Sequence, residues 1–188
     1  MQEYVTRAVV LDKQLRGGDA DARYSFFTER YGKIAAKAKS SRKIVSKLAG
    51  HLEPGTVAAV RIIETYGAQV IDALKFGRVK IPIAQLAALN SLLPEWQPEA
   101  ELWNELVQSA SIEASAANAG AAGMQKNFSW TNALAILGWD PYGAVCAHCN
   151  LLNRPARYFY IPRQEFFCTS CAAASRFGRD ALILADGQ

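Results

Sequence analysis

The sequence contains few of the side chains that enzymes use for proton transfer, and the usual catalytic motifs do not occur in it. There are two histidines: His51 follows Gly50, and His148 stands between two cysteines. The sequence has no Gly-rich phosphate loop, no Gly-x-Ser-x-Gly and no His-Glu-x-x-His. We therefore expect that the protein is not an enzyme and has no catalytic residues.

Long hydrophobic runs are also missing. No stretch reaches the roughly 18 uninterrupted apolar residues that a membrane-spanning helix needs, and the alanine-rich residues 114–123 are too short and too polar. The N-terminal sequence MQEYVTRAVVL carries an acid early and lacks the apolar segment of a secretory signal. We expect a soluble, cytoplasmic protein with no membrane partner.

Cysteine is scarce, and all four cysteines fall in two Cys-x-x-Cys pairs. The pairs are Cys146/Cys149 and Cys168/Cys171, and 18 residues separate them. Each pair can place two sulfurs on one turn, and the intervening chain can bring four thiolates to the tetrahedral corners that Zn²⁺ prefers. Because a four-cysteine site leaves no open coordination position, we expect a structural Zn²⁺ ion and not a hydrolytic one.

This cysteine pattern has alternative interpretations. A disulfide framework is typical of much smaller secreted chains, and a thioredoxin-like redox pair is typical of a βαβ surrounding that this sequence does not suggest. His148 could replace one sulfur, but four cysteines complete the site without it. Zinc bound by the four cysteines is our first interpretation.

The net charge of +4 is distributed unevenly along the chain. Residues 1–80 contain 15 Lys/Arg and 8 Asp/Glu, whereas residues 81–140 contain a single Lys against six acids, and residues 141–188 contain five Arg against three acids. A basic block joined to an acidic one suggests that the first block meets a polyanion. We expect three modules, with boundaries at 1–78, 79–140 and 141–188.

The first module has the pattern of a small β-barrel. Short apolar or alternating runs are separated by turn signals such as Arg16-Gly-Gly-Asp and Glu53-Pro-Gly-Thr. Five short strands close most economically as a barrel, because an open sheet would leave two unprotected edges. An OB-fold is our first choice and an SH3-like barrel the second. The predicted strands cover residues 5–11, 24–28, 33–39, 56–64 and 68–75.

Beyond Ile81 the hydrophobic period becomes that of helices. Leucines recur at helical spacing from residue 86 to residue 93, and a second run covers residues 102–107. Ser129 is placed to cap a third helix that ends at Gly138. The predicted fold class is therefore α+β and multi-domain: a five-stranded OB-fold barrel, a small helical domain, and a C-terminal four-cysteine zinc finger packed on the helical domain.

The segment RYGKIAAKAKSSRKIVSK, residues 30–47, contains seven cations and no acid. Because alternate residues of a strand face opposite sides, Lys33, Lys37 and Lys39 share one face while apolar residues occupy the other. Such a basic stripe suits a nucleic-acid backbone. The candidate DNA-binding residues are Arg30, Lys33, Lys37, Lys39, Arg42, Lys43 and Lys47.

Aromatic residues near this segment are candidates for stacking on bases, namely Tyr24, Phe27 and Tyr31. The alternative interpretation is a solvated strand face whose aromatic residues lie in the core. Ordinary surfaces interleave both signs of charge, so seven cations without an acid favour a binding surface.

The order of several motifs resembles that of the RecO family, the bacterial recombination mediators of DNA repair. In the N-terminal half the matching residues are Phe27-Thr28-Glu29, Tyr31-Gly32-Lys33, Ala38-Lys39, Arg42, Ser46-Lys47 and Leu52-Glu53-Pro54. In the C-terminal half they are Gly138-Trp139-Asp140-Pro141, the two Cys-x-x-Cys pairs and the aromatic Arg157-Tyr-Phe-Tyr between them. The resemblance covers the barrel and the cysteine region well and the helical middle weakly.

The resemblance implies a DNA-binding OB-fold, a helical domain and an embedded zinc finger. It also implies a function in DNA repair: annealing complementary single strands and helping to load recombinase onto DNA coated by single-stranded-DNA-binding protein, with a RecR-type partner. In that family the acidic tail of single-stranded-DNA-binding protein docks on the helical part beside cations. Here the middle is shorter and has almost no Lys or Arg, so no residue is assigned to that role.

A second hypothesis is a zinc-containing adaptor that binds RNA or other proteins and does not anneal strands. An OB-fold accepts either nucleic acid. Competition between single-stranded RNA and DNA, together with an annealing assay, separates the two hypotheses.

Overall fold

The computed structural model describes residues 1–15, 21–39, 48–112, 127–151, 155–178 and 181–185. The chain divides into two compact units, residues 1–128 and 129–188, and each is described by itself. The residues predicted as a helical domain, 79–140, are shared between the two units. The candidate DNA-binding residues Arg42, Lys43 and Lys47 lie outside the described residues.

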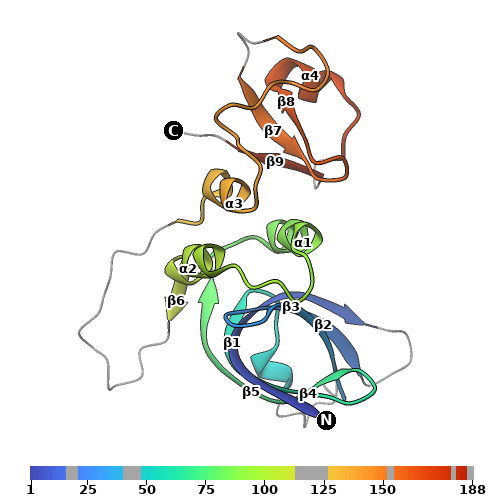
Figure 1. The fold of residues 1–188 in the computed structure, drawn as a ribbon, viewed down its shortest axis with the longest axis vertical. Helices are drawn as coiled ribbons and strands as arrows, with labels where there is room; N and C mark the ends of the chain where they lie inside the picture. Colours follow the sequence, from blue (N-terminus) through green and yellow to red (C-terminus); the bar gives the residue numbers. More distant parts are fainter. Residues whose placement is uncertain (16–20, 40–47, 113–126, 152–154, 179–180, 186–188) are drawn as a thin grey trace, which may run out of the picture. The chain divides into compact units, whose positions relative to one another are not determined.

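Five strands of the first unit form a closed barrel (Figure 1). They are β1 (Gln2–Leu15), β2 (Ala22–Thr28), β3 (Gly32–Ala38), β4 (Thr56–Glu64) and β5 (Ala68–Val79), with the short 3₁₀ helix η1 (Ala49–His51) before β4. All neighbouring pairs are antiparallel except β3 and β5, whose parallel pairing at Lys37–Gln69 and Ala38–Val70 closes the barrel. This is the predicted OB-fold.

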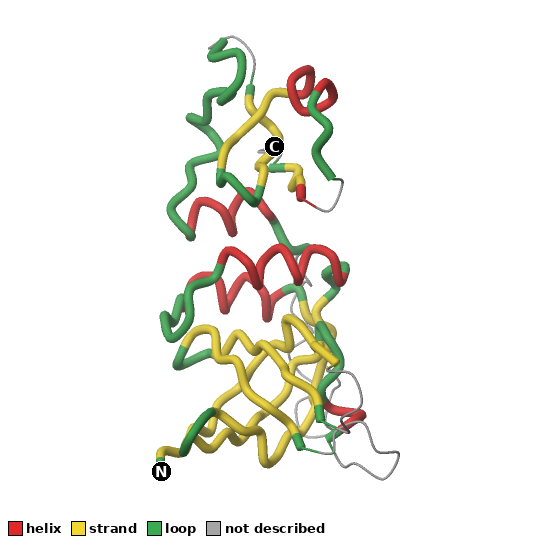
Figure 2. Tube along the Cα trace, turned by 90° about the vertical axis from the view of Figure 1, so that its right-hand side faces the viewer, coloured by secondary structure: helices red, strands yellow, loops and turns green. Residues whose placement is uncertain are grey.

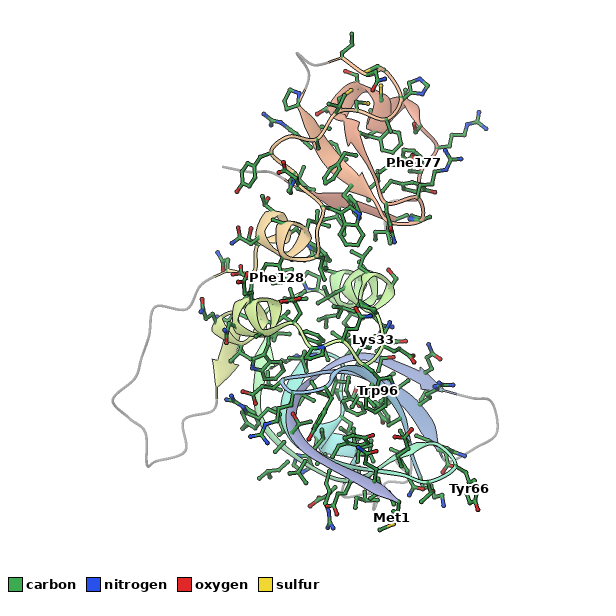
Figure 3. All side chains as sticks on the ribbon, viewed as in Figure 1. Met1, Lys33, Tyr66, Trp96, Phe128 and Phe177 are labelled. Atoms are coloured by element: carbon green, nitrogen blue, oxygen red, sulfur yellow. The ribbon has the colours of Figure 1, made fainter. Side chains whose placement is uncertain are left out.

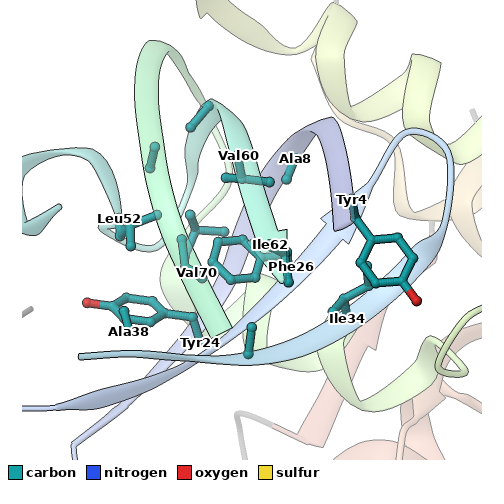
Figure 4. Packing of buried hydrophobic residues seen from close by; sticks show 14 of the residues in the cluster. Tyr4, Ala8, Tyr24, Phe26, Ile34, Ala38, Leu52, Val60, Ile62 and Val70 are labelled. Carbon is teal, nitrogen blue, oxygen red and sulfur yellow. The ribbon is translucent and has the colours of Figure 1, made fainter. Parts of the chain in front are cut away.

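The barrel interior is filled by side chains that alternate along each strand (Figure 4). On β3 the buried residues are Ile34, Ala36 and Ala38, and the lysines at the alternate positions point outward as predicted. Tyr24 and Phe26 from β2 are completely buried in the same cluster, with their rings 6.0 Å apart. Burying this apolar surface is the main term that stabilises the barrel.

Two helices form a layer beside the barrel in the first unit (Figure 2). These are α1 (Ile83–Leu92) and α2 (Ala100–Gln108), and the strand β6 (Ala110–Ile112) that follows pairs with β5. The buried residues of α2 include Trp103, whose ring lies 6.3 Å from that of Phe27 on β2. The outer face of β2 is therefore covered near its end, which explains why the adjacent residues Phe26 and Phe27 are both buried.

The end of α1 and the segment that follows it are tied to the start of β3. The backbone N–H of Trp96 donates to the carbonyl oxygen of Lys33 at 3.0 Å, and Lys33 Nζ donates to the carbonyl oxygen of Asn90 at 2.9 Å. Figure 3 labels Lys33 and Trp96 in this region. Gly32 permits the approach, because a Cβ there would lie 2.1 Å from the carbonyl oxygen of Gln97.

The second unit contains α3 (Trp130–Ile136) and a three-stranded antiparallel sheet of order β8-β7-β9. Ser129 caps α3 as predicted, since its Oγ accepts from the backbone N–H of Asn132 at 3.3 Å. Gly138 follows the helix with a φ of 94°. The remaining elements are β7 (Ala156–Tyr160), β8 (Glu165–Cys168), α4 (Thr169–Ala174) and β9 (Leu182–Leu184).

No helix within the described ranges has both the length and the apolar character that crossing a lipid bilayer would require.

Candidate metal centre and nucleic-acid interface

The four cysteines come together in the second unit, as their spacing predicts. Cys146 and Cys149 lie on a turn before β7, Cys168 ends β8, and Cys171 lies in α4. Their Sγ atoms all lie within 4.8 Å of one another, and Cys149 and Cys168 are 3.9 Å apart. None of the four forms a disulfide, so the structure does not support the disulfide alternative.

The surroundings of Cys146 and Cys168 favour their thiolate forms. Burial opposes ionisation of Cys146, but hydrogen bonds from the backbone of Cys149, Cys168 and His148 outweigh it and lower its pKa to about 6. The backbone N–H of Cys171 likewise lowers the pKa of Cys168. Burial and the neighbouring thiols raise the pKa of Cys171 to about 12. Four crowded sulfurs cannot all ionise together unless a cation offsets their charge, which fits a metal site.

An aromatic cluster supports the cysteines. Phe167 is buried beside Cys146 and Cys168, and Phe177 packs against it with ring centroids 5.0 Å apart. Phe177 also stacks on Tyr160 at 4.1 Å. The cysteine turns are therefore packed on a small aromatic sheet. In domains of this size a metal commonly completes the fold. Among the described residues the sulfur cluster consists of the four cysteines alone, and His148 is exposed.

The second candidate site lies on the outer face of β2 and β3. The register of this hairpin places Arg23 directly opposite Lys37, and both side chains are exposed. Lys37 Nζ forms an ion pair with Asp21 Oδ2 at 2.8 Å. These three residues line a pocket of about 310 Å³ with Ala22, Ala35, Gly67 and Ala68. The pocket joins the open part of the β2–β3 face to the β4–β5 turn.

The β4–β5 turn presents an aromatic side chain beside this pocket. Tyr66 immediately precedes Gly67, which lines the pocket, and its side chain is fully exposed (Figure 3). In OB-folds the face of strands 2 and 3 and the turn between strands 4 and 5 are where oligonucleotides bind. Two cations beside an exposed aromatic ring provide both a phosphate contact and a stacking surface.

The predicted cations have different surroundings. Lys37 and Lys39 are exposed at the end of β3, and Arg30 is exposed in the β2–β3 turn. Lys33 is half-buried, and its hydrogen bond to Asn90 ties β3 to α1. Of the four predicted cations that fall within the described residues, Lys37 lines the pocket.

The stacking prediction is wrong for two of its three residues. Tyr24 and Phe27 are completely buried, the first inside the barrel and the second beneath α2, so neither presents a ring to a base. Tyr31 is half-buried against Tyr4, with ring centroids 5.0 Å apart.

Arg23 and Tyr66 were not among the residues predicted from the sequence. The position of Arg23 could have been found from the tight turn between β2 and β3, because pairing Thr28 with Gly32 fixes the pairing of Arg23 with Lys37. No comparable local signal points to Tyr66. Its position beside the pocket depends on the closure of the barrel through β3 and β5.

Comparisons with known proteins agree with this architecture. Residues 1–77 match the family model described as the N-terminal domain of recombination protein O. Over 199 aligned residues the chain is 26% identical to the DNA repair protein RecO of Thermodesulfovibrio yellowstonii, and the alignment covers 95% of this chain and 74% of that protein. The second match extends the similarity beyond the barrel into the cysteine-containing unit.

Proposed function

Because the chain belongs to the RecO family of DNA repair proteins, we propose that it binds single-stranded DNA through its barrel and anneals complementary strands. We further propose that it assists recombinase loading on DNA coated by single-stranded-DNA-binding protein. Neither activity requires a nucleophile or a general base, so we propose that the protein acts without catalysing a covalent reaction.

The observation that carries the proposal is the open basic pocket of the β2–β3 face. Arg23 and Lys37 are directly opposite each other on the strand pair, and both side chains are exposed. Both are long cations that can reach phosphate oxygens, and Arg can do so with two parallel hydrogen bonds. Tyr66, next to the pocket, offers a ring to an unpaired base.

This arrangement favours a single strand over a duplex. A stacked and paired base does not expose its face to a protein side chain, whereas a base in a single strand does. Two complementary strands repel each other through their phosphates. A surface that neutralises some of these charges raises the local concentration of strands and leaves base pairing to drive the reaction.

We propose that the four cysteines bind one structural Zn²⁺ ion. Their sulfur atoms are close enough to share one ion, and four thiolates are a common ligand set for structural zinc. When bound, the ion supplies the positive charge that allows all four sulfurs to remain ionised. The chain's own contribution is the set of backbone N–H groups that lower the pKa of Cys146 and of Cys168 and so favour their thiolate forms.

We propose a RecR-type mediator and single-stranded-DNA-binding protein as partners, on the basis of the family. An acidic tail needs cations, and residues 81–112 contain no Lys or Arg. In the second unit, Arg157, Arg163 and Arg176 are exposed. Binding of a fluorescent tail peptide, with and without substitution of these arginines, tests this partner.

The direct test of the proposal is annealing of two complementary fluorescent oligonucleotides by the full chain. We expect faster annealing than without protein, and tighter binding to single strands than to duplex. The variant Arg23→Ala/Lys37→Ala should lose most of both effects, whereas Arg61→Ala, an exposed arginine on β4, should retain them. Equal affinity for RNA and DNA without annealing would instead support an RNA-binding adaptor.

A further inference from the structure

The binding pocket of the barrel contains a carboxylate where a nucleic-acid ligand would bring a phosphate. Asp21 stands directly before β2, and its Oδ2 atom lies 2.8 Å from Nζ of Lys37. Both residues line the pocket together with Arg23. A carboxylate oxygen and a phosphate oxygen are equivalent acceptors for a lysine ammonium group, so each can occupy the same position on Lys37.

We propose that Asp21 is an internal competitor that occupies Lys37 until a DNA phosphate replaces it. This inference rests on the proposed function, since it assumes that the pocket receives a nucleic-acid backbone. It assigns Asp21 a specific role: Asp21 limits the affinity of the barrel for DNA and so allows bound strands to leave.

The exposure of the ion pair makes the exchange feasible. The Lys37 side chain is 54% exposed and that of Asp21 is 24% exposed, so water reaches the contact. Ion pairs that are accessible to water are weak, because solvent screens the attraction and hydrates each charge once the pair opens. A phosphate can therefore displace the carboxylate without exposing an unsolvated charge.

The position of Asp21 makes the competition persistent. Asp21 belongs to the backbone that leads into β2, and the register of β2 with β3 holds Ala22 opposite Ala38. When a phosphate takes Lys37, the carboxylate remains beside the pocket and repels it. A protein that anneals strands needs such moderation, because a strand held too tightly cannot be handed over to its complement as a duplex.

The test compares Asp21→Asn with the unchanged protein in binding to a fluorescent oligo(dT) across a range of salt concentrations. We expect Asp21→Asn to bind about three- to tenfold more tightly at low salt, from removal of one nearby negative charge. The slope of log K against log salt should be larger in magnitude for this variant by up to about 0.7, the value for one additional phosphate contact on a single strand. Release of the strand should be slower.

The matched control is Glu3→Gln, which changes the net charge by the same amount at another ion pair. Glu3 pairs with Arg61 on the β1–β4 side of the barrel. We expect little change in affinity from this variant. An equal gain from Glu3→Gln would show that overall charge is responsible and would overturn the assignment to Asp21.

A double-mutant cycle with Lys37→Ala tests whether Asp21 acts through Lys37. If Asp21 competes for Lys37, the gain from Asp21→Asn should be clearly smaller when Lys37 is already alanine. An undiminished gain on the Lys37→Ala background, or no gain on either background, contradicts the competition. If the unchanged protein does not bind the oligonucleotide at all, the proposed function itself fails, and the two failures are therefore distinguishable.

Discussion

At the scale of single residues, Gly32 has the most restricted position in the barrel. Its φ is 71°, in the region that side chains other than glycine rarely adopt, and the backbone of Gln97 lies where a Cβ would be placed. Backbone cannot move aside as the end of a flexible side chain can. Gly32 therefore allows both the β2–β3 turn and the contact of the α1–α2 connection with β3.

Gly32→Ala should destabilise the barrel by about 2–4 kcal/mol, because backbone strain and a steric clash add at one position. The measurement is the urea midpoint followed by far-UV circular dichroism. Gly50→Ala is the control, since no atom lies within 4 Å of the place where its Cβ would stand, and its effect should stay within about 0.5 kcal/mol. Equal midpoints for the two variants would contradict this explanation of Gly32.

Arg23 and Lys37 form the smallest unit of the proposed DNA site. Replacing either by alanine should weaken binding to all single-stranded sequences alike, because phosphate contacts carry no sequence information. Each substitution should also reduce the magnitude of the salt slope by about 0.7 on single strands. Fluorescence anisotropy at several salt concentrations measures both effects. A slope that stays unchanged in both variants would place the DNA site elsewhere.

At the scale of secondary-structure elements, the proposed function makes the β4–β5 turn the segment that would distinguish single-stranded from duplex DNA. This turn presents Tyr66 without covering it, next to the pocket between β2 and β3. Stacking of one base on an aromatic ring contributes about 1–3 kcal/mol. A duplex cannot use this contribution unless it opens.

Tyr66→Ala should therefore weaken single-strand binding by about five- to 150-fold, which is the stacking energy of one base converted to affinity, and should weaken duplex binding much less. Tyr142→Ala is the control, because Tyr142 is another exposed tyrosine but lies in the second unit. Parallel losses for single strands and duplex would argue against stacking. No loss in either would remove Tyr66 from the site.

The strands could be predicted from the sequence because alternation and turn residues are local signals. The predicted strand at 56–64 coincides with β4, and the outward face of β3 was identified correctly. Whether a helix covers an outward-facing strand residue depends on the tertiary structure, and the alternation of apolar and polar residues along a strand does not encode it. Phe27 and Lys33 have outward positions, yet Trp103 of α2 packs on the first and Asn90 of α1 accepts a hydrogen bond from the second.

The two candidate sites differed in how far the sequence could predict them. The clustering of the four cysteines could be predicted because a repeated Cys-x-x-Cys spacing is a direct signal of such a cluster. The proposed DNA surface could be predicted only as a basic segment. Its actual pocket combines Arg23 from β2 with Lys37 from β3, beside the turn that carries Tyr66, and only the closed barrel places these segments together.

At the scale of the whole molecule, the two units differ in the composition of their cores. The barrel has a continuous apolar core, whereas the second unit packs its aromatic residues around four cysteines. A structural metal commonly supplies the folding free energy that so small a core lacks. The units should therefore respond differently when the metal is removed.

Removal of zinc by a chelator, or the substitution Cys168→Ser, should unfold the second unit and leave the barrel folded. Elemental analysis should find about one zinc per chain before treatment, and limited proteolysis should then cut the second unit first. His148→Ala is the control and should retain zinc, because its side chain is exposed outside the sulfur cluster. A metal-free protein with an equally stable second unit would contradict the assignment.

The central claim is that the barrel binds nucleic-acid backbones by electrostatics. The most direct measurement is the affinity of the full chain for a single-stranded oligonucleotide as salt concentration is varied. We predict that log K falls linearly with log salt with a slope of about −2.8 to −3.5, as expected when four or five cations contact phosphates of a single strand. An affinity that does not change with salt, or no measurable binding at low salt, would contradict the claim.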